Sequence, residues 1–261
     1  MNYIRCRCGE RVFWALEEQD CAAVLTAAPY LGGVPTGERL PLQQVTLLAP
    51  CEGGKIVAVG KNYREHIQEM QADFGDAVPE KPVLFFKPST CINDPDGAVV
   101  YPDFSHRVDY EGELAAVIGR RMSHGSAEEA LDYVFGYTIC NDITARDIQK
   151  SEGQWTRGKA VDGFAPVGPR IVQGLDPAAL QVKTRLNGEL RQDGRTADFI
   201  TPLPQLLAFM TEAMSLLPGD LVITGTPAGV GPMVPGDVVE VEIPGIGVLR
   251  SRIVSGEGGA Q

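Results

Sequence analysis

The stretch DYEGELAAVIG, residues 109–119, opens the segment 108–149 around which the chain is organised, and NDITARDIQ, residues 141–149, closes it. The apolar run 114–118 predicts a strand that includes the two glutamates before it. Glu111 and Glu113 are two residues apart, and side chains alternate along a strand, so both carboxylates are expected on one face. The pattern therefore places two acidic groups together at the start of a buried strand.

A third carboxylate follows a second predicted strand. Asp142 ends the strand that is predicted from the apolar run Tyr133 to Cys140. Carboxylates crowded together repel one another unless a cation lies between them. An all-oxygen set of ligands favours a hard cation such as Mg²⁺, Mn²⁺ or Ca²⁺. The alternative is an exposed polar face of an edge strand, because two glutamates at this spacing are a common pattern.

Composition and charge exclude several classes of protein. The 261 residues are 44% hydrophobic and 22% charged, which is typical of a globular protein with a full core. A net charge of −11 argues against a nucleic-acid partner, because phosphate binding needs clustered lysine and arginine. The apolar runs are too short for a membrane span, and the N-terminus has no signal-peptide pattern. Six cysteines without a C-x-x-C pair are expected as free thiols in a cytoplasmic protein.

The chain is expected to divide near residues 50–54, where PCEGG is a run typical of a boundary. Residues 1–50 are predicted to form a small β-rich domain that opens with a hairpin of residues 3–7 and 12–16. Residues 55–253 form the main domain, and 254–261 a flexible tail. Strands dominate, and no glycine-rich G-x-G-x-x-G motif follows a strand, so a dinucleotide-binding fold is rejected.

Other patterns predict the local elements of the main domain. Asn187-Gly188 predicts a hairpin between strands 182–186 and 189–192. Thr201-Pro202 is expected to cap a helix, and Ser126 to start another with Glu129 as its capping partner. The remaining expectations are strands at 55–59, 83–87, 221–224, 239–243 and 248–253, a short helix at 61–70 and a mobile loop at 71–82.

Polar residues after Asp142 are spaced as on one face of a helix. Asp142, Arg146 and Gln149 fall at i, i+4 and i+7. If Asp142 holds a cation, the other two side chains project towards the same cavity. Arg146 then presents a forked set of donors that suits a substrate carboxylate. The alternative is an ordinary Asp–Arg pair on a solvated helix.

Three further sites are candidates for chemistry. His66 and Glu69 are three residues apart on the short helix, so the carboxylate can hold the imidazole as a general base. Lys159, in a polar loop, can stabilise a developing oxyanion or enolate. Thr226 lies in a glycine-flanked loop that can grip a carboxylate. The alternatives are a surface His–Glu pair, a solvated lysine and a plain tight turn.

Taken together, these motifs resemble the fumarylacetoacetate hydrolase family. The match covers residues 55–253 in order, and the first 50 residues resemble the small domain that precedes the catalytic domain in many bacterial members. The resemblance rests on the runs KIVAVGKNYREHIQEM, FFKPST, DYEGELAAVIG, GYTICNDITARDIQ, RGKAVDGFAPVGP, LNGELRQ, LLPGDLVITGTPAGVG and PGDVVEVEIPGIG.

The resemblance implies a mostly β catalytic domain, a mixed, rolled β-sandwich with a few helices, which is usually a homodimer. It implies that Mg²⁺ or Mn²⁺ is bound by Glu111, Glu113 and Asp142. It implies that water is activated from a closing lid by His66 and Glu69. It also implies that a small-molecule 2-oxo acid substrate is contacted by Lys159, Arg146, Gln149 and Thr226.

One departure from the family narrows the expected substrates. The longer hydrolases of eukaryotic tyrosine breakdown carry an additional aspartate ligand and a pocket tyrosine, and neither can be placed here. The chain is more similar to the compact subgroup that acts on acylpyruvates, oxaloacetate and intermediates of aromatic catabolism.

The expected reaction is C–C bond hydrolysis of an acylpyruvate-type compound through a metal-bound enolate, with Lys159 stabilising the oxyanion. Decarboxylation of oxaloacetate and isomerisation of 2-hydroxyhepta-2,4-diene-1,7-dioate are the main alternatives. A catalytically silent metal-binding dimer and a sugar-acid dehydratase also remain open.

Overall fold

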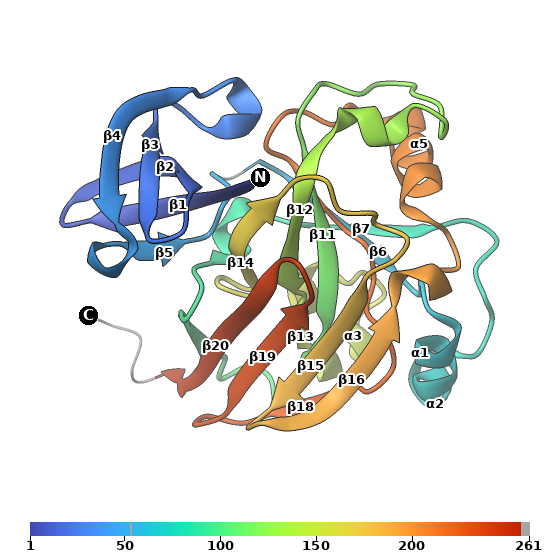
Figure 1. Ribbon diagram of the computed structural model, residues 1–261. Helices are drawn as coiled ribbons and strands as arrows, with labels where there is room; N and C mark the ends of the chain where they lie inside the picture. Colours follow the sequence, from blue (N-terminus) through green and yellow to red (C-terminus); the bar gives the residue numbers. More distant parts are fainter. Residues whose placement is uncertain (53, 257–261) are drawn as a thin grey trace.

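The computed structural model describes residues 1–52 and 54–256. One large mixed sheet runs through it, in the order β4-β3-β2-β1-β14-β12-β11-β17-β6-β7 (Figure 1). Its N-terminal strands are β1 (Asn2–Cys8), β2 (Arg11–Glu17), β3 (Cys21–Leu25), β4 (Pro35–Pro41) and β5 (Thr46–Leu48), with short 3-10 turns at Pro29–Leu31 and Leu42–Gln44. The predicted hairpin of β1 and β2 is present, with Cys8 opposite Arg11.

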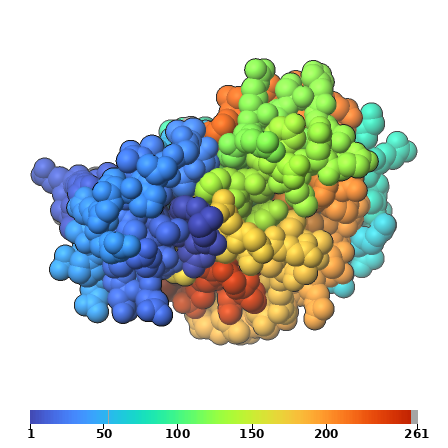
Figure 2. All heavy atoms as spheres, turned by 45° about the horizontal axis from the view of Figure 1, so that its top comes forward, coloured from blue at the N-terminus to red at the C-terminus, as the bar shows by residue number. Residues whose placement is uncertain are grey.

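The N-terminal strands join the rest of the molecule edge to edge. Strand β1 pairs with β14, so the large sheet continues from one part of the chain into the other. Figure 1 shows the N-terminal strands as a blue group beside the remainder of the protein, and Figure 2 shows the atoms of this group in contact with it. The central strands are β14 (Ala165–Val172), β12 (Val134–Asn141), β11 (Gly112–Ile118), β17 (Leu221–Ile223), β6 (Ile56–Gly60), β7 (Val83–Lys87) and the short β8 (Ile92–Asn93).

Two smaller sheets complete the β architecture, so the prediction of a mostly β fold is confirmed. One contains β16 (Glu189–Arg195), β15 (Gln181–Leu186), β19 (Val238–Ile243), β20 (Gly247–Ser255) and β9 (Ala98–Tyr101). The other contains β13 (Thr144–Ala145), β10 (Val108–Tyr110) and β18 (Gly231–Met233). The turn between β15 and β16 has Asn187 and Gly188 at φ of 52° and 82°, which is the geometry that this dipeptide favours.

Strand β11 lies at the centre because both of its faces are covered. Leu114, Ala116 and Ile118 pack into one core cluster, together with residues of β19 and of helix α5. Ala115 and Val117 pack into a second cluster on the opposite face. This two-sided burial explains why the strand reads as a continuous apolar run instead of an alternating one.

Helices are short and lie outside the sheets. They are α1 (Arg64–Glu69), α2 (Gln71–Phe74), α3 (Arg146–Ser151), α4 (Thr156–Lys159) and α5 (Leu203–Ala213), with 3-10 turns at Ser89–Cys91, Ala130–Tyr133 and Thr196–Asp198. Helix α5 buries Leu206, Leu207 and Met210, as its pattern predicts, and Pro202 is its N-cap. None of the described helices is long and apolar enough to cross a membrane.

Three local expectations were wrong. Ser126 starts no α-helix. Its N–H donates to the Glu129 carboxylate at 3.4 Å, but the chain then forms only the 3-10 turn that begins at Ala130. The predicted loop 71–82 begins with helix α2. The predicted tail overlaps β20, which extends to Ser255, and its last residues, 257–261, lie outside the described residues, as does residue 53 of the predicted boundary.

Candidate active site

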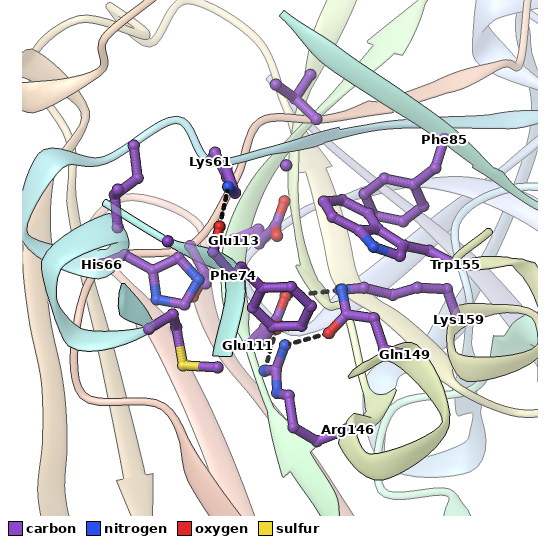
Figure 3. A pocket seen from close by; sticks show the side chains of 16 residues that line it. Lys61, His66, Phe74, Phe85, Glu111, Glu113, Arg146, Gln149, Trp155 and Lys159 are labelled. Atoms are coloured by element: carbon purple, nitrogen blue, oxygen red, sulfur yellow. Dashed lines mark hydrogen bonds and ion pairs between the residues drawn. The ribbon is translucent and has the colours of Figure 1, made fainter. Parts of the chain in front are cut away.

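A cavity opens where the ends of several strands meet two pairs of short helices. Figure 3 shows that its wall is part charged and part aromatic. The strand ends supply Lys61, Glu111, Glu113 and Thr226; helices α1 and α2 supply His66, Ile67, Met70 and Phe74; the segment 146–159 supplies Arg146, Gln149, Trp155 and Lys159. Seven of the nine predicted site residues therefore line the cavity, although they come from distant parts of the chain. The other two, Glu69 and Asp142, contact the lining residues His66 and Lys159.

Three carboxylates converge on the floor of this cavity. Ligand oxygens of Glu111, Glu113 and Asp142 all lie within 4.8 Å of one another, and each residue is at least 95% buried. The pairing of β11 with β12 produces this convergence, because Gly112 lies opposite Asn141. The Asp142 N–H donates to the Glu111 carbonyl at 2.8 Å, which ties the two ends together. We refer to these three residues as the acid cluster.

The backbone positions the acid cluster differently from the single strand that was expected. Glu111 and Glu113 do not belong to one continuous strand. β10 ends at Tyr110 and β11 begins at Gly112, so Glu111 lies between two strands. Gly112 follows Glu111, and a Cβ there would lie 2.3 Å from the Thr184 hydroxyl oxygen. A side chain is therefore sterically excluded between the two glutamates. Glu111 is held instead by the Asn141 side chain, which accepts its N–H at 2.9 Å.

Two buried lysines compensate part of the negative charge. Lys159 Nζ lies 2.8 Å from a Glu111 oxygen and 2.7 Å from Asp142 Oδ2. Lys87 Nζ lies 2.7 Å from Asp142 Oδ1 and also donates to the carbonyls of Ile143 and Lys159. Lys159 was expected in a polar loop, but it ends helix α4 and is 2% exposed, because its ion pairs make burial tolerable. Lys87 was missed, although it stands in the quoted run FFKPST.

The acid cluster still carries more negative charge than its lysines neutralise. Burial, together with Asp142 and Glu111, raises the pKa of Glu113 well above its usual value, and the Gly225 N–H, 2.7 Å away, opposes that rise only in part. Burial also disfavours ionisation of Glu111, but Lys159 and Arg146 outweigh it and lower the Glu111 pKa. A divalent cation at this position would relieve the repulsion, and the carboxylate oxygens are ligands that Mg²⁺ and Mn²⁺ accept. The acid cluster therefore fits a divalent metal.

Arg146 and Gln149 point into the cavity from the first turns of helix α3. Arg146 Nη1 donates to Gln149 Oε1 at 2.6 Å, and another guanidinium nitrogen contacts Glu111. The expectation of one helix face running from Asp142 was wrong in part, because α3 begins only at Arg146. Asp142 reaches the same place from the end of β12. Figure 3 shows Arg146 below Glu111 and Gln149 beside it.

Asp109 is a buried residue that sequence reasoning did not select. Its carboxylate accepts from Arg146 Nε at 2.8 Å and from Arg107 at 3.0 and 3.1 Å. It is fully buried, so it depends on these two arginines for charge compensation. Because both Asp109 oxygens are engaged, Arg146 has a fixed orientation beside Glu111. The only signal was its place in the quoted run DYEGEL.

Helices α1 and α2 cover the opposite side of the cavity. His66 Nδ1 lies 3.3 Å from Glu69 Oε2, and the Glu69 carboxylate also accepts the Gly229 N–H at 3.0 and 3.1 Å. Figure 3 shows the imidazole directed towards the interior of the cavity. The predicted pair is thus formed, and Glu69 itself is anchored to a loop from the far end of the chain. We call α1 and α2 the lid helices.

Thr226 lines the cavity, but its hydroxyl is already engaged. The Thr226 Oγ1 donates to the Gly112 carbonyl at 3.0 Å and accepts from Gln192 at 2.7 Å. Gln192 in turn accepts the Gly112 N–H at 3.0 Å. Thr226 and Gln192 together therefore hold the backbone between the two glutamates. Cys140 and the other five cysteines are free, as expected.

Comparisons with known proteins agree with this geometry. Residues 55–254 match the family model described as fumarylacetoacetate (FAA) hydrolase C-terminal, and residues 1–50 match one described as Rv2993c-like, N-terminal. Protein Rv2993c of Mycobacterium tuberculosis is 48% identical, with 85% of this chain and 84% of that protein covered. Oxaloacetate tautomerase YisK of Bacillus subtilis is 41% identical over 81% of this chain and 74% of that protein.

The solved structures show the same relationship. The crystal structure of 5-carboxymethyl-2-hydroxymuconate delta-isomerase from Mycobacterium smegmatis has a TM-score of 0.91 and 39% identity, covering 98% of this chain and 100% of that one. The Bacillus subtilis relative is named as a tautomerase and the Mycobacterium smegmatis protein as an isomerase, so both names are those of enzymes. The sequence match, the fold and the acid cluster lead to one conclusion: the chain belongs to the fumarylacetoacetate hydrolase family.

Proposed function

We propose that this protein is a divalent-metal-dependent enzyme that moves a proton at C3 of a 2-oxo acid, and so catalyses a keto–enol tautomerisation or a related isomerisation. One observation carries the proposal. A histidine held by a carboxylate faces three converging carboxylates across a single cavity. A metal-binding face opposite a general base is the arrangement that enolisation requires.

The floor of the cavity has the role of binding and orienting the substrate. Mg²⁺ or Mn²⁺ held by Glu111, Glu113 and Asp142 would polarise the 2-oxo group and make the C3 proton more acidic. Arg146 offers donors to the substrate carboxylate, and Gln149 sets the direction of its guanidinium. Lys159 keeps Glu111 and Asp142 in place and puts positive charge where the substrate oxygen becomes negative.

The lid helices supply the proton transfer. His66 accepts a proton from C3 through its free imidazole nitrogen and returns it to carbon or oxygen. Glu69 holds the imidazole in one orientation and stabilises its charged form. Phe74 and Trp155 line the same cavity and exclude water from it, which strengthens the interactions with the developing charge.

Hydrolysis of a C–C bond in an acylpyruvate is a second candidate. The His66–Glu69 pair favours it, because the same base would activate a water molecule if the substrate left room for one. We place proton transfer first because similar proteins are named as an oxaloacetate tautomerase and a delta-isomerase. Decarboxylation of oxaloacetate uses the same floor without the base.

A panel of small substrates separates these reactions. The protein, loaded with Mg²⁺ or Mn²⁺, is mixed with freshly dissolved enol-oxaloacetate, and the decay of enol absorbance is followed beside pyruvate release. Faster enol decay without pyruvate supports the tautomerase. Pyruvate from an acylpyruvate supports the hydrolase, and pyruvate from oxaloacetate the decarboxylase. Enol decay at the rate of buffer and metal alone would rule out the tautomerase.

The proposal extends to the oligomeric state of the protein. The family resemblance leads us to propose a homodimer, which light scattering coupled to gel filtration would test. A mass of 28.1 kDa is that of one chain, so a monomer elution would contradict it.

A further inference from the structure

Lys61 differs from the other cations that line the cavity. Arg146 pairs with Asp109 and Glu111, and Lys159 pairs with Glu111 and Asp142. Lys61 Nζ donates at 2.9 Å to the carbonyl of Phe74, a neutral group. Within residues 1–52 and 54–256 it forms no ion pair with a carboxylate. Its positive charge is therefore available to an anionic ligand.

The backbone at Lys61 is held in an unfavourable conformation. Its φ is 57°, in the left-handed region where glycine or asparagine is the usual residue. The preceding Gly60 lies against the Trp155 ring, since a Cβ there would be 2.5 Å from a ring carbon. This tight turn at the end of β6 brings the lysine to the cavity wall. The left-handed backbone at Lys61 therefore determines where its side chain enters the cavity.

The position of Lys61 is opposite that of Arg146. Figure 3 shows the two cations on different sides of Glu111 and Glu113. The side near Arg146 and Gln149 suits the carboxylate next to the 2-oxo group. Near Lys61, the residues Phe74, Gly60 and Trp155 bear no charge. The Glu113 carboxylate lies on the side towards Arg146 (Figure 3). An ammonium in this surrounding attracts an anion more strongly than it would in open solvent.

We propose that Lys61 binds a second, distal carboxylate of the substrate and thereby selects 2-oxo dicarboxylates over 2-oxo monocarboxylates. This inference rests on the proposed function, because it assumes that a 2-oxo acid occupies the cavity. An ammonium group has three donors. One contacts the Phe74 carbonyl at the end of α2, and the other two remain for the carboxylate. The distal group thus binds next to the lid helices.

Binding of stable analogues tests the inference without catalysis. Malate and 2-hydroxybutanoate differ only in having a carboxylate or a methyl group at C4, and neither has a ketone to enolise. Their dissociation constants are measured by calorimetry or by competition with oxalate, which has no distal group, on the Mg²⁺-loaded protein. We expect malate to bind the unmodified protein at least tenfold more tightly than 2-hydroxybutanoate.

Three variants assign that preference to Lys61. Lys61→Met keeps the length of the side chain but removes its charge, and should weaken malate about ten- to a hundredfold while oxalate and 2-hydroxybutanoate change less than about twofold. Lys61→Arg should restore most of the preference for malate. Lys81→Met removes the same charge from an exposed position outside the cavity and should change neither ligand.

Two outcomes overturn the inference. One is an unmodified protein that binds malate no more tightly than 2-hydroxybutanoate. The other is an equal loss of all three ligands in Lys61→Met, which would mean that the lysine only fastens the Phe74 carbonyl. Failure of the proposed function looks different: enol-oxaloacetate would not be turned over, although the preference for malate and its dependence on Lys61 would remain.

Discussion

The acid cluster and the lid helices face each other across one cavity but are built in opposite ways. Glu113 stands at the start of β11, which pairs on both sides with β12 and β17 and is buried on both faces. The lid helices have six and four residues, and mainly Ile67 and Met70 anchor them. Helices this short have little stability of their own. The contrast teaches that the acid cluster rests on a firmly packed sheet, whereas His66 lies on the least anchored part of the cavity wall.

Replacing Glu113 should have the broadest effect, because it impairs both metal binding and turnover. Glu113→Gln keeps the shape of the side chain but removes one of three anionic ligands, so we expect metal affinity and turnover to fall by about 10²- to 10³-fold or more. Metal content after dialysis and calorimetry with Mn²⁺ measure this. Glu128→Gln, at an exposed position, is the matched control. Full activity after chelation and Mg²⁺ readdition would contradict the assignment of the metal site.

Replacing His66 should impair proton transfer from the lid helices and leave metal binding at the acid cluster intact. His66→Gln removes the base, so the turnover number should fall by about 10²- to 10⁴-fold, while Mn²⁺ affinity changes little. Enol decay and calorimetry on the same preparation separate the two readouts. Glu65→Gln, exposed on the same helix, should behave as the unmodified protein. A parallel loss of metal binding would show that lid and floor are not independent.

Asp109 supports the floor of the cavity because it pairs with Arg146. Asp109→Asn leaves buried Arg146 without its carboxylate partner, and we expect the free energy of unfolding to fall by about 3 kcal/mol. The KM for a 2-oxo acid should rise as Arg146 loses its orientation. Arg107→Ala, which removes the partly exposed partner of Asp109, should cost about 1 kcal/mol or less. Denaturant titration and initial rates distinguish these outcomes. Equal losses in both variants would show that the buried Arg146–Asp109 pair contributes no more than the Arg107–Asp109 pair.

The raised pKa of Glu113 makes metal binding at the floor of the cavity depend on pH. Because folding raises this pKa, the neutral form stabilises the metal-free protein at low pH, and that stability declines as pH rises through the raised value. A metal requires the ionised form, so Mn²⁺ affinity should rise with pH, by up to about tenfold per unit, with release of a proton. Calorimetry in buffers of different ionisation enthalpy counts that proton. Glu113→Gln should lose this proton release. An unchanged number of protons released would show that the proton does not come from Glu113.

The exposed ion pair at the lid should give the smallest effect. Lys150 contacts Asp73 of α2, and its side chain is 52% exposed, so solvent screens the interaction. Lys150→Ala should lower the free energy of unfolding by less than about 1 kcal/mol and raise KM by less than about threefold. The difference should shrink in about 1 M salt, where exposed charges are screened. A large, salt-independent effect would mean that the lid is as firmly fixed as the floor.

Local patterns determined much of the architecture. The Asn187-Gly188 turn, the β1–β2 hairpin and the apolar run of β11 were predictable because each depends on the conformational preferences of neighbouring residues. The order of the motifs identified the family. The helix expected at Ser126 failed because a capping contact does not supply the buried apolar face that a helix also needs.

The sequence by itself therefore determined the family, the mostly β fold and the identity of the acidic residues. Only the tertiary structure decided how these residues meet. The β11–β12 register brings Asp142 to Glu111, and buried Lys87, Lys159 and Asp109 balance charges that lie far away in the chain. These pairings are nonlocal and depend on burial, which changes the strength of a charge but leaves no mark in the order of the residues.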